Sequence, residues 1–176
     1  MHASSGQTPA AVLVPLFLGP DGRDPHAVFT RRRTDLRRHA GEISFPGGRQ
    51  DPDDADLADT ALREAEEEIG LPRAQVSLLG ELPPVSTFAT NYVIHPFVGL
   101  IPTGLSWEAS PSEVDAVLEI PLNALRTGRT RTRMERRGIA FETDAYLVDE
   151  YLIWGATARI LESLLERAEE LLPATR

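Results

Sequence analysis

Residues 47 to 71, GGRQDPDDADLADTALREAEEEIGL, decide how this chain of 176 residues is interpreted. The stretch begins with two glycines, passes through an acidic loop and ends in residues that favour a helix, chiefly Ala, Leu, Arg and Glu. We expect Asp56 or Asp59 to cap the N-terminus of this helix. Gly70 is placed for a left-handed C-terminal cap, and Pro72 prevents continuation. A buried stripe is predicted from apolar residues at helical spacing: Ala58, Leu62, Ala65 and Ile69.

Three glutamates of this helix, Glu64, Glu67 and Glu68, are three or four residues apart and therefore share one face. Glu66 points the other way. Each like-charged pair costs roughly 0.2–0.5 kcal/mol, and Arg63, which can reach one of the three, does not neutralise the cluster. A hard divalent cation does, because Mg²⁺ prefers oxygen ligands and phosphate-bearing substrates. The alternative is a solvated acidic helix face.

A basic segment comes directly before the glycine pair. Residues 31–48 read RRRTDLRRHAGEISFPGG, with five Arg among the first eight residues. A solvated basic turn is one interpretation. Beside a metal site the alternative is a set of cations for a substrate with several phosphates, because guanidinium groups pair well with phosphate oxygens.

These two segments together resemble a known family. Residues 63–70, REAEEEIG, resemble the second half of the Nudix box, the metal-binding loop and helix of the Nudix hydrolases. The first half departs from the usual spacing, and one extra loop residue places Gly48 as the box glycine and Asp54 as its acid. The segment before the box is similar to the signature of the coenzyme A pyrophosphatase subgroup, which has the longer loop. The matching residues are Arg33, Leu36, Arg37, His39, Gly41, Glu42, Phe45, Pro46, Gly47 and Gly48.

The resemblance implies which residues form the site. Glu64, Glu67 and Glu68 are expected to bind Mg²⁺ or Mn²⁺ and to carry the hydrolysis, with Glu67 or Glu68 taking the proton of the attacking water. Glu113 resembles the glutamate that some Nudix enzymes bring from outside the box as a further ligand or base. An exposed glutamate at the start of a strand is the alternative for Glu113.

Substrate contacts are expected from the basic segment and the glycine pair, namely Arg33, Arg37, His39, Gly47 and Gly48. The glycine turn lets the backbone approach phosphates closely because it has no Cβ. For the histidine we favour a structural or substrate-positioning role over that of an acid, base or ligand. Arg63 and Asp54 are expected to support the site, since an ion pair between Arg63 and a loop carboxylate locks the helix to its loop.

The remaining pattern predicts the fold. Buried strands are expected over 10–18 and 27–33, paired with each other, and further strands over 76–81, 92–101 and 113–121. A short helix at 122–126, an Arg-rich hairpin arm at 126–137, one or two strands within 141–153 and an amphipathic helix at 156–172 follow. This pattern gives an α/β or α+β class and suggests an α/β/α sandwich. The resemblance implies the Nudix fold, a mixed β-sheet between helices. One domain is expected over 10–176, with the box at 47–71 and a loose segment at 1–9.

Composition narrows the function classes. The net charge of −9 argues against broad nucleic-acid binding. Cysteine is absent, so disulfides and thiolate metal sites are not available. No apolar run is long enough to span a bilayer and no signal-peptide pattern is present, which favours a cytoplasmic enzyme acting on a small molecule. The sequence leaves the choice between monomer and homodimer open.

The leading hypothesis is hydrolysis of coenzyme A and its derivatives to 3′,5′-ADP and 4′-phosphopantetheine products. An alternative is broader Nudix activity on ADP-ribose, dinucleotides or nucleoside triphosphates. A Nudix domain that senses a nucleotide without turnover is an alternative of another class. The complete set of Glu64, Glu67 and Glu68 argues against it.

Overall fold

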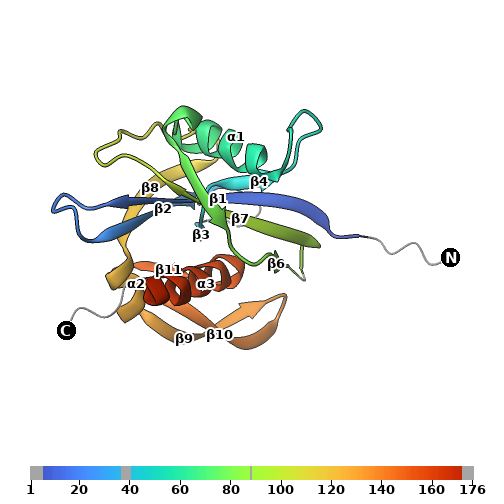
Figure 1. Ribbon diagram of the computed structural model, residues 1–176. Coiled ribbons are helices and arrows are strands. Elements are labelled where there is room, and N and C mark those ends of the chain that lie inside the picture. The colour runs from blue at the N-terminus through green and yellow to red at the C-terminus, as the bar shows by residue number, and fades with distance from the viewer. Residues whose placement is uncertain (1–5, 37–40, 88, 172–176) are drawn as a thin grey trace.

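The computed structural model describes residues 6–36, 41–87 and 89–171 (Figure 1). In chain order its elements are β1 Thr8–Leu18, β2 Pro25–Arg32, β3 Ile43–Ser44, β4 Gly47–Arg49, α1 Leu57–Ile69, a 3₁₀ turn Arg73–Gln75, β5 Ser77–Glu81, β6 Val85–Ser86, β7 Tyr92–Leu100, β8 Val114–Pro121, α2 Leu122–Thr127, β9 Arg129–Arg136, β10 Ile139–Val148, β11 Tyr151–Ile153 and α3 Gly155–Leu171.

Strand β1 is the centre of the main sheet. It pairs in parallel with β7 along nine residues, and on its other edge it pairs antiparallel with β4 and then with β2. β2 continues the sheet to β3 and β8, and β7 continues it to β5 and β6. The sheet is therefore mixed, as expected. Neighbours on both edges and layers on both faces explain why β1 is a nearly continuous apolar run.

Helices cover the two faces of this sheet (Figure 1). Leu13 and Phe17 of β1 pack on the side of α1 with Ala61, Ala65 and Ile69 of that helix. Val14, one residue on from Leu13, packs on the opposite side with apolar residues of α3. Alternate side chains of one strand thus fill two cores. The predicted α/β/α sandwich is confirmed.

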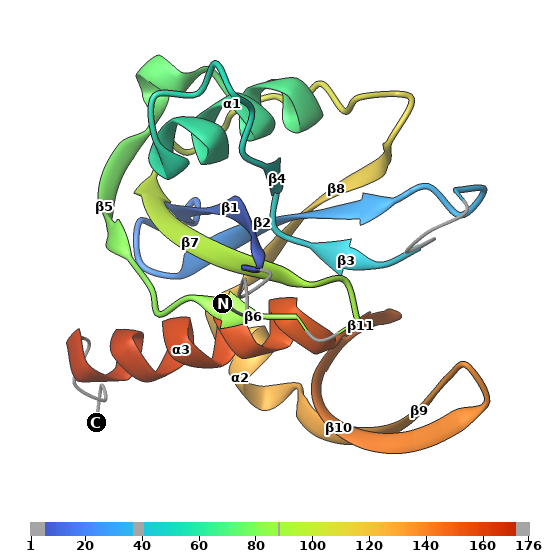
Figure 2. The same cartoon turned by 90° about the vertical axis from the view of Figure 1, so that its right-hand side faces the viewer.

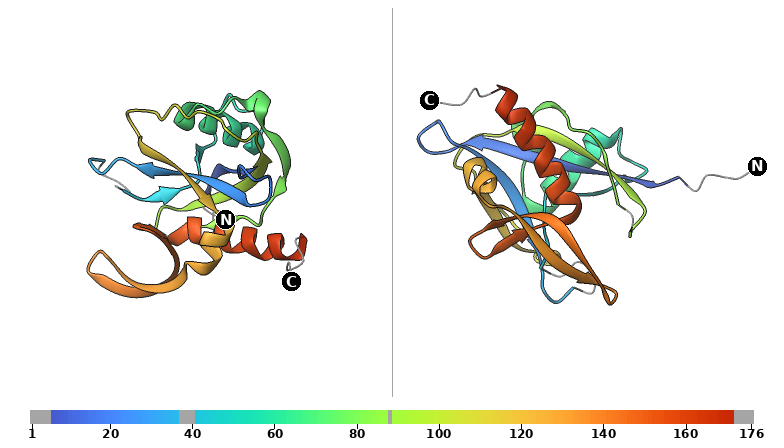
Figure 3. Two further views of the ribbon diagram at one scale, coloured as in Figure 1. Left: turned by 90° about the vertical axis from the view of Figure 1, so that its left-hand side faces the viewer. Right: turned by 90° about the horizontal axis from the view of Figure 1, so that it is seen from below.

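A second, three-stranded sheet of order β11-β10-β9 lies on the α3 side of the molecule. The β9–β10 hairpin curves away from the main body, and α3 crosses beneath the main sheet (Figures 2 and 3). The Arg-rich hairpin arm predicted over 126–137 is therefore present. Its first residues belong to the end of α2, and β10 already begins at Ile139, two residues before the predicted strand.

Most boundaries differ from expectation by one or two residues, and two differences bear on the N-terminus and on the site. The loose segment was placed at 1–9, but Thr8 and Pro9 already belong to β1, because they pair with Tyr92 and Val93 of β7. The glycine pair 47–48 was expected as a turn and instead forms most of strand β4, because it pairs with β1. No helix within the described residues is long and apolar enough to cross a membrane.

Candidate metal-dependent active site

Helix α1 carries the glutamates, and local interactions fix both of its ends. At the N-terminus, Asp56 Oδ1 accepts a hydrogen bond of 2.8 Å from the backbone N–H of Asp59, so Asp56 is the cap. At the C-terminus, Gly70 has the predicted left-handed conformation with φ of 68°, and its N–H donates to the carbonyl of Glu66.

The buried side of α1 agrees with the predicted stripe in part. Ala65 and Ile69 are buried, whereas Ala58 and Leu62 are only half-buried, and Leu62 packs against the same core. The other buried positions are Thr60, Ala61 and Glu68. The prediction missed Thr60 and Glu68 because it counted apolar residues alone. The helix packs against both β1 and β4, and this contact surface takes in a threonine and a glutamate.

Glu68 is buried, with 8% of its surface exposed. Its Oε2 accepts a hydrogen bond of 3.2 Å from the N–H of Gly47 at the start of β4. Burial raises the pKa of Glu68 to about 8, and the nearby carboxylates of Glu64 and Glu113 act in the same direction. The Gly47 N–H and Arg32 oppose this shift without cancelling it. A carboxylate in this position needs a nearby cation in order to be ionised at neutral pH.

Glu64 lies against the second glycine of the pair. A Cβ added to Gly48 would come within 2.5 Å of Glu64 Oε1, so a larger residue here would displace this carboxylate. A Cβ on Gly47 would come within 2.3 Å of the carbonyl oxygen of Ala11 in β1. Packing against the backbone therefore requires glycine at position 47, whereas glycine at position 48 leaves room for the Glu64 side chain. Burial also raises the pKa of Glu64, while the adjacent Arg63 lowers it.

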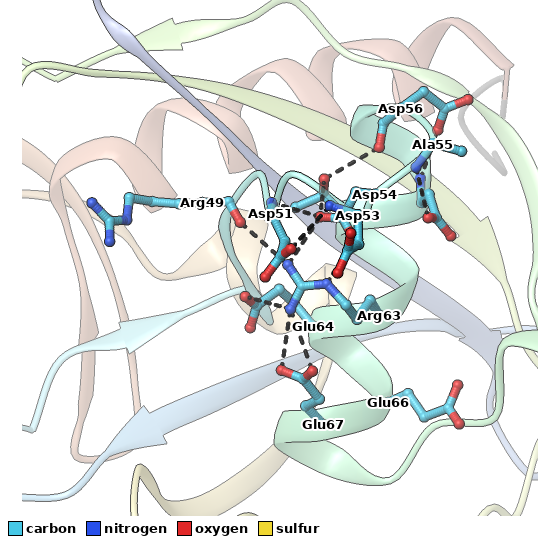
Figure 4. A network of polar contacts seen from close by, with 12 residues as sticks. Arg49, Asp51, Asp53, Asp54, Ala55, Asp56, Arg63, Glu64, Glu66 and Glu67 are labelled. Carbon is cyan, nitrogen blue, oxygen red and sulfur yellow. Dashed lines mark hydrogen bonds and ion pairs between the residues drawn. The ribbon is translucent and has the colours of Figure 1, made fainter.

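Arg63 joins the helix to the acidic loop. Its Nε donates to Asp54 Oδ1 at 2.7 Å and one Nη donates to Asp54 Oδ2 at 3.0 Å, which is a two-point ion pair. The other Nη donates to Glu64 at 3.2 Å and to Glu67 at 3.2 Å. Figure 4 shows Glu64 and Glu67 turned toward the Arg63 guanidinium, with Glu66 pointing away. The hydrogen bonds from Arg63 hold the pKa of Asp54 well below its usual range.

Glu113 is brought to the site by backbone hydrogen bonds. The N–H of Ser110 donates to the carbonyl of Glu68 at 2.8 Å, and the N–H of Glu113 donates to the carbonyl of Ser110 at 3.2 Å. The loop before β8 is thereby fixed to the C-terminal part of α1. Consequently the Glu113 carboxylate is close enough to Glu64 and Glu68 to raise the pKa of both.

Comparison with known proteins decides the family. Residues 7–140 match the family model described as "NUDIX domain". The chain is 42% identical over 165 residues to proteins named "Uncharacterized Nudix hydrolase NudL" from Salmonella paratyphi B and Salmonella newport, covering 93% of this chain and 84% of each relative. The chain belongs to the Nudix hydrolase family.

Solved structures agree with the Nudix fold. A Nudix hydrolase from M. smegmatis, RenU, superposes with a TM-score of 0.67 at 15% identity, covering 97% of this chain and 91% of that one. The NUDIX domain of Shewanella oneidensis NrtR, solved in complex with ADP ribose, superposes with a TM-score of 0.59 at 13% identity, covering 93% and 89%. At these identities the likeness concerns the fold alone.

The carboxylates expected to bind metal in this Nudix domain lie in two environments. Glu68 is buried and Glu64 partly buried, and burial raises the pKa of both, whereas the Glu67 side chain is 60% exposed and makes an ion pair with Arg63. Among residues 6–36, 41–87 and 89–171, no group of three His, Asp or Glu is arranged so that it could hold a metal ion as it stands.

The predicted substrate residues are only partly described. Arg33 donates from Nε to Asp35 at 2.9 Å and from Nη1 to the carbonyl of Pro111 at 2.5 Å, so it fastens the basic segment to the loop before β8. Arg37 and His39 lie outside the described residues.

Arg32 is a residue near the Nudix carboxylates that sequence reasoning missed. It lies at the end of β2, and its positive charge lowers the pKa of Glu68. Its Nε is buried without a hydrogen-bond partner among the described residues. The alternation of side chains between the two faces of β2 was the available indication in the sequence. Val28 packs on the α1 side, so Arg32, four residues later, points to the same side.

Proposed function

We propose that the protein uses Mg²⁺ or Mn²⁺ to hydrolyse the diphosphate bond of coenzyme A and its derivatives, giving 3′,5′-ADP and 4′-phosphopantetheine products. The observation that carries this proposal is where residues 41–48 lie. They are the last part of the segment 33–48, which carries the resemblance to the coenzyme A pyrophosphatase subgroup, and they contain β3 and the start of β4. Through the Gly47 N–H this segment contacts the buried carboxylate of Glu68.

The donor chemistry fits a hard divalent cation. Glu64 and Glu68 are carboxylates whose pKa values are raised by burial, and a nearby cation offsets the cost of ionising them. We assign Glu64, Glu67 and Glu68 as ligands, with Glu113 as a further one. When bound, the ion supplies charge neutralisation for the diphosphate oxygens and makes water easier to deprotonate.

The other roles belong to the chain's own residues. Glu67 or Glu68 accepts the proton of the attacking water, and the scissile P–O bond breaks as the new one forms. Arg63 and Asp54 act as positioning residues, because their ion pair holds the helix and the acidic loop in one arrangement. We assign Arg32, whose positive charge acts on the Glu68 carboxylate, to the binding of phosphate oxygens.

The test is incubation with coenzyme A and Mg²⁺ and detection of 3′,5′-ADP by chromatography. Glu68→Gln is the inactive variant. Glu66→Gln is the matched control, because Glu66 is on the same helix, is exposed and faces away from the site. Product from wild type and Glu66→Gln, but not from Glu68→Gln, supports the proposal.

Other outcomes separate the alternatives. Turnover of ADP-ribose or a dinucleotide without turnover of coenzyme A keeps the Nudix chemistry and rejects coenzyme A as substrate. Binding of a nucleoside diphosphate without turnover of any diphosphate, in Mg²⁺ and in Mn²⁺, points to a sensing module.

A further inference from the structure

A pocket separate from the carboxylates lies beside strand β3. Its volume is about 420 Å³, within the range of small-molecule sites. Its walls come from β3, from β6 with the start of β7, from the tip of the β9–β10 hairpin and from the first turn of α3. Figure 2 shows β3, β6, the start of α3 and the hairpin tip on the same side of the molecule. Below, this hollow is called the β3–α3 pocket.

The charge of the β3–α3 pocket is opposite to that of the whole chain. Its charged lining residues are two arginines, Arg136 and Arg159, and one acidic residue, Glu42, whereas the net charge of the protein is −9. Arg159 is oriented by a hydrogen bond of 2.8 Å from Nη1 to the carbonyl of Ser86. The Arg136 side chain makes no ion pair or hydrogen bond with any residue in the described part of the chain. The first turn of α3 adds the positive end of a helix of 17 residues.

The same pocket offers two aromatic rings. Tyr92 at the start of β7 and Trp154 just before α3 both line it and are both half-buried. Rings of this kind, close to arginines, suit a ligand that combines a flat heterocycle with a phosphate.

The pocket and the carboxylate site are joined by a short piece of chain. Ser44 of β3 lines the pocket, and three residues later Gly47 donates its N–H to Glu68. Three residues span at most about 10 Å. The pocket is therefore next to the carboxylate site along the chain, with the Cα atoms of Ser44 and Gly47 at most about 10 Å apart.

We infer that the β3–α3 pocket binds the 3′-phosphoadenosine end of the substrate. The adenine contacts Trp154 and Tyr92, and the 3′-phosphate is bound by Arg136 from the hairpin tip together with Arg159. This inference rests on the proposed function and adds to it the way in which the nucleotide end is recognised. It also gives the Arg-rich hairpin a role, because Arg136 belongs to the binding site.

Binding of the nucleotide product tests the inference without turnover. The chain has two tryptophans, so Trp107→Phe leaves Trp154 as the sole reporter of indole fluorescence. We expect 3′,5′-ADP to change this fluorescence in EDTA. We also expect it to bind at least about tenfold more tightly than 5′-AMP, since the charge-assisted contacts with Arg136 and Arg159 are lost with the 3′-phosphate. Calorimetric titration of the wild-type protein gives the same comparison without any substitution at tryptophan.

Arg136→Gln is the decisive variant, because it should reduce the preference for 3′,5′-ADP over 5′-AMP, with Arg159 as the remaining cationic partner. Arg133→Gln is its matched control. Arg133 is exposed on the same strand, three residues away, so its side chain lies on the other face of the hairpin. Arg133→Gln should keep the tenfold preference.

Three results would overturn the inference: equal affinity for the two nucleotides, an equal loss in both arginine variants, or a response of Trp154 to 4′-phosphopantetheine in place of 3′,5′-ADP. The proposed function fails separately. If wild type binds 3′,5′-ADP through Arg136 but does not cleave coenzyme A, the result supports the pocket assignment and contradicts the proposed function. If coenzyme A is cleaved with no dependence on Arg136, the result supports the proposed function and contradicts the pocket assignment.

Discussion

Replacing Glu68 by Gln should stabilise the metal-free protein at neutral pH, although it removes a residue that we assign to catalysis. The carboxyl group has a pKa of about 8 in the folded protein, against an ordinary value of 4.5. Between these two pH values the unfolded chain releases a proton that the folded chain keeps. Stability is therefore complete below about pH 4.5 and decreases as the pH rises toward 8. Glutamine is neutral at every pH and avoids this loss.

The magnitude follows from the interval between the two pKa values. At pH 7 the unfolded state lies roughly 2.5 pH units above its pKa, and each unit corresponds to 1.36 kcal/mol, which gives a gain of about 3 kcal/mol for Glu68→Gln. At pH 5 the same reasoning gives about 1 kcal/mol or less. For a chain of this length, about 3 kcal/mol corresponds to a rise in Tm of roughly 6–12 °C.

The assay is denaturation by urea or heat in EDTA, at pH 5 and pH 7, on wild type, Glu68→Gln and the control Glu66→Gln. The exposed control should change the free energy of unfolding by no more than about 0.5 kcal/mol. Saturating Mg²⁺ should then stabilise wild type much more than Glu68→Gln. The reasoning is refuted if Glu68→Gln is no more stable than wild type at pH 7, or if its gain is the same at both pH values.

Three further substitutions test the surroundings of the site. Asp54→Asn should cost roughly 3–5 kcal/mol at pH 7, because it leaves Arg63 without its buried partner. Because the pKa of Asp54 is lowered, wild type should begin to lose this stabilisation below about pH 4 and lose more as the pH falls further, whereas the variant should not. Urea titrations at pH 3 and 7 should therefore show a smaller difference between the two proteins at pH 3. Gly48→Ala should mainly displace the Glu64 carboxylate, so we expect at least about tenfold weaker Mg²⁺ binding by calorimetry with a small change in Tm. Gly47→Ala should instead lower the free energy of unfolding by about 2–4 kcal/mol, because its Cβ meets the backbone of β1. An equal change in Tm in the two glycine variants would contradict this distinction.

The glycine pair shows where a local interpretation was insufficient. In the sequence, two glycines after a proline are typical of a turn that lets a phosphate approach the backbone. In the folded chain, one glycine is required by β1 and the other by Glu64. Neither requirement is visible locally, because both partners come from segments distant in sequence.

The sequence by itself determined most of the elements and the residue types that we assign to the site. The caps of α1, the apolar run of β1 and the spacing of Glu64, Glu67 and Glu68 are local properties, and each was predicted from residue type and periodicity. The ion pair of Arg63 with a loop carboxylate was also predicted, since both groups lie within the box. These features depend on neighbours within a few turns of the chain.

Only the tertiary structure decided how the glutamates differ from one another. Periodicity places Glu64, Glu67 and Glu68 on one face, but packing against β1 and β4 buries Glu68 and leaves Glu67 in solvent. The loop before β8 adds Glu113, and the end of β2 adds Arg32. The physical reason is that burial and the electrostatic field at a carboxylate depend on segments far apart in the chain, which spacing within one helix does not encode.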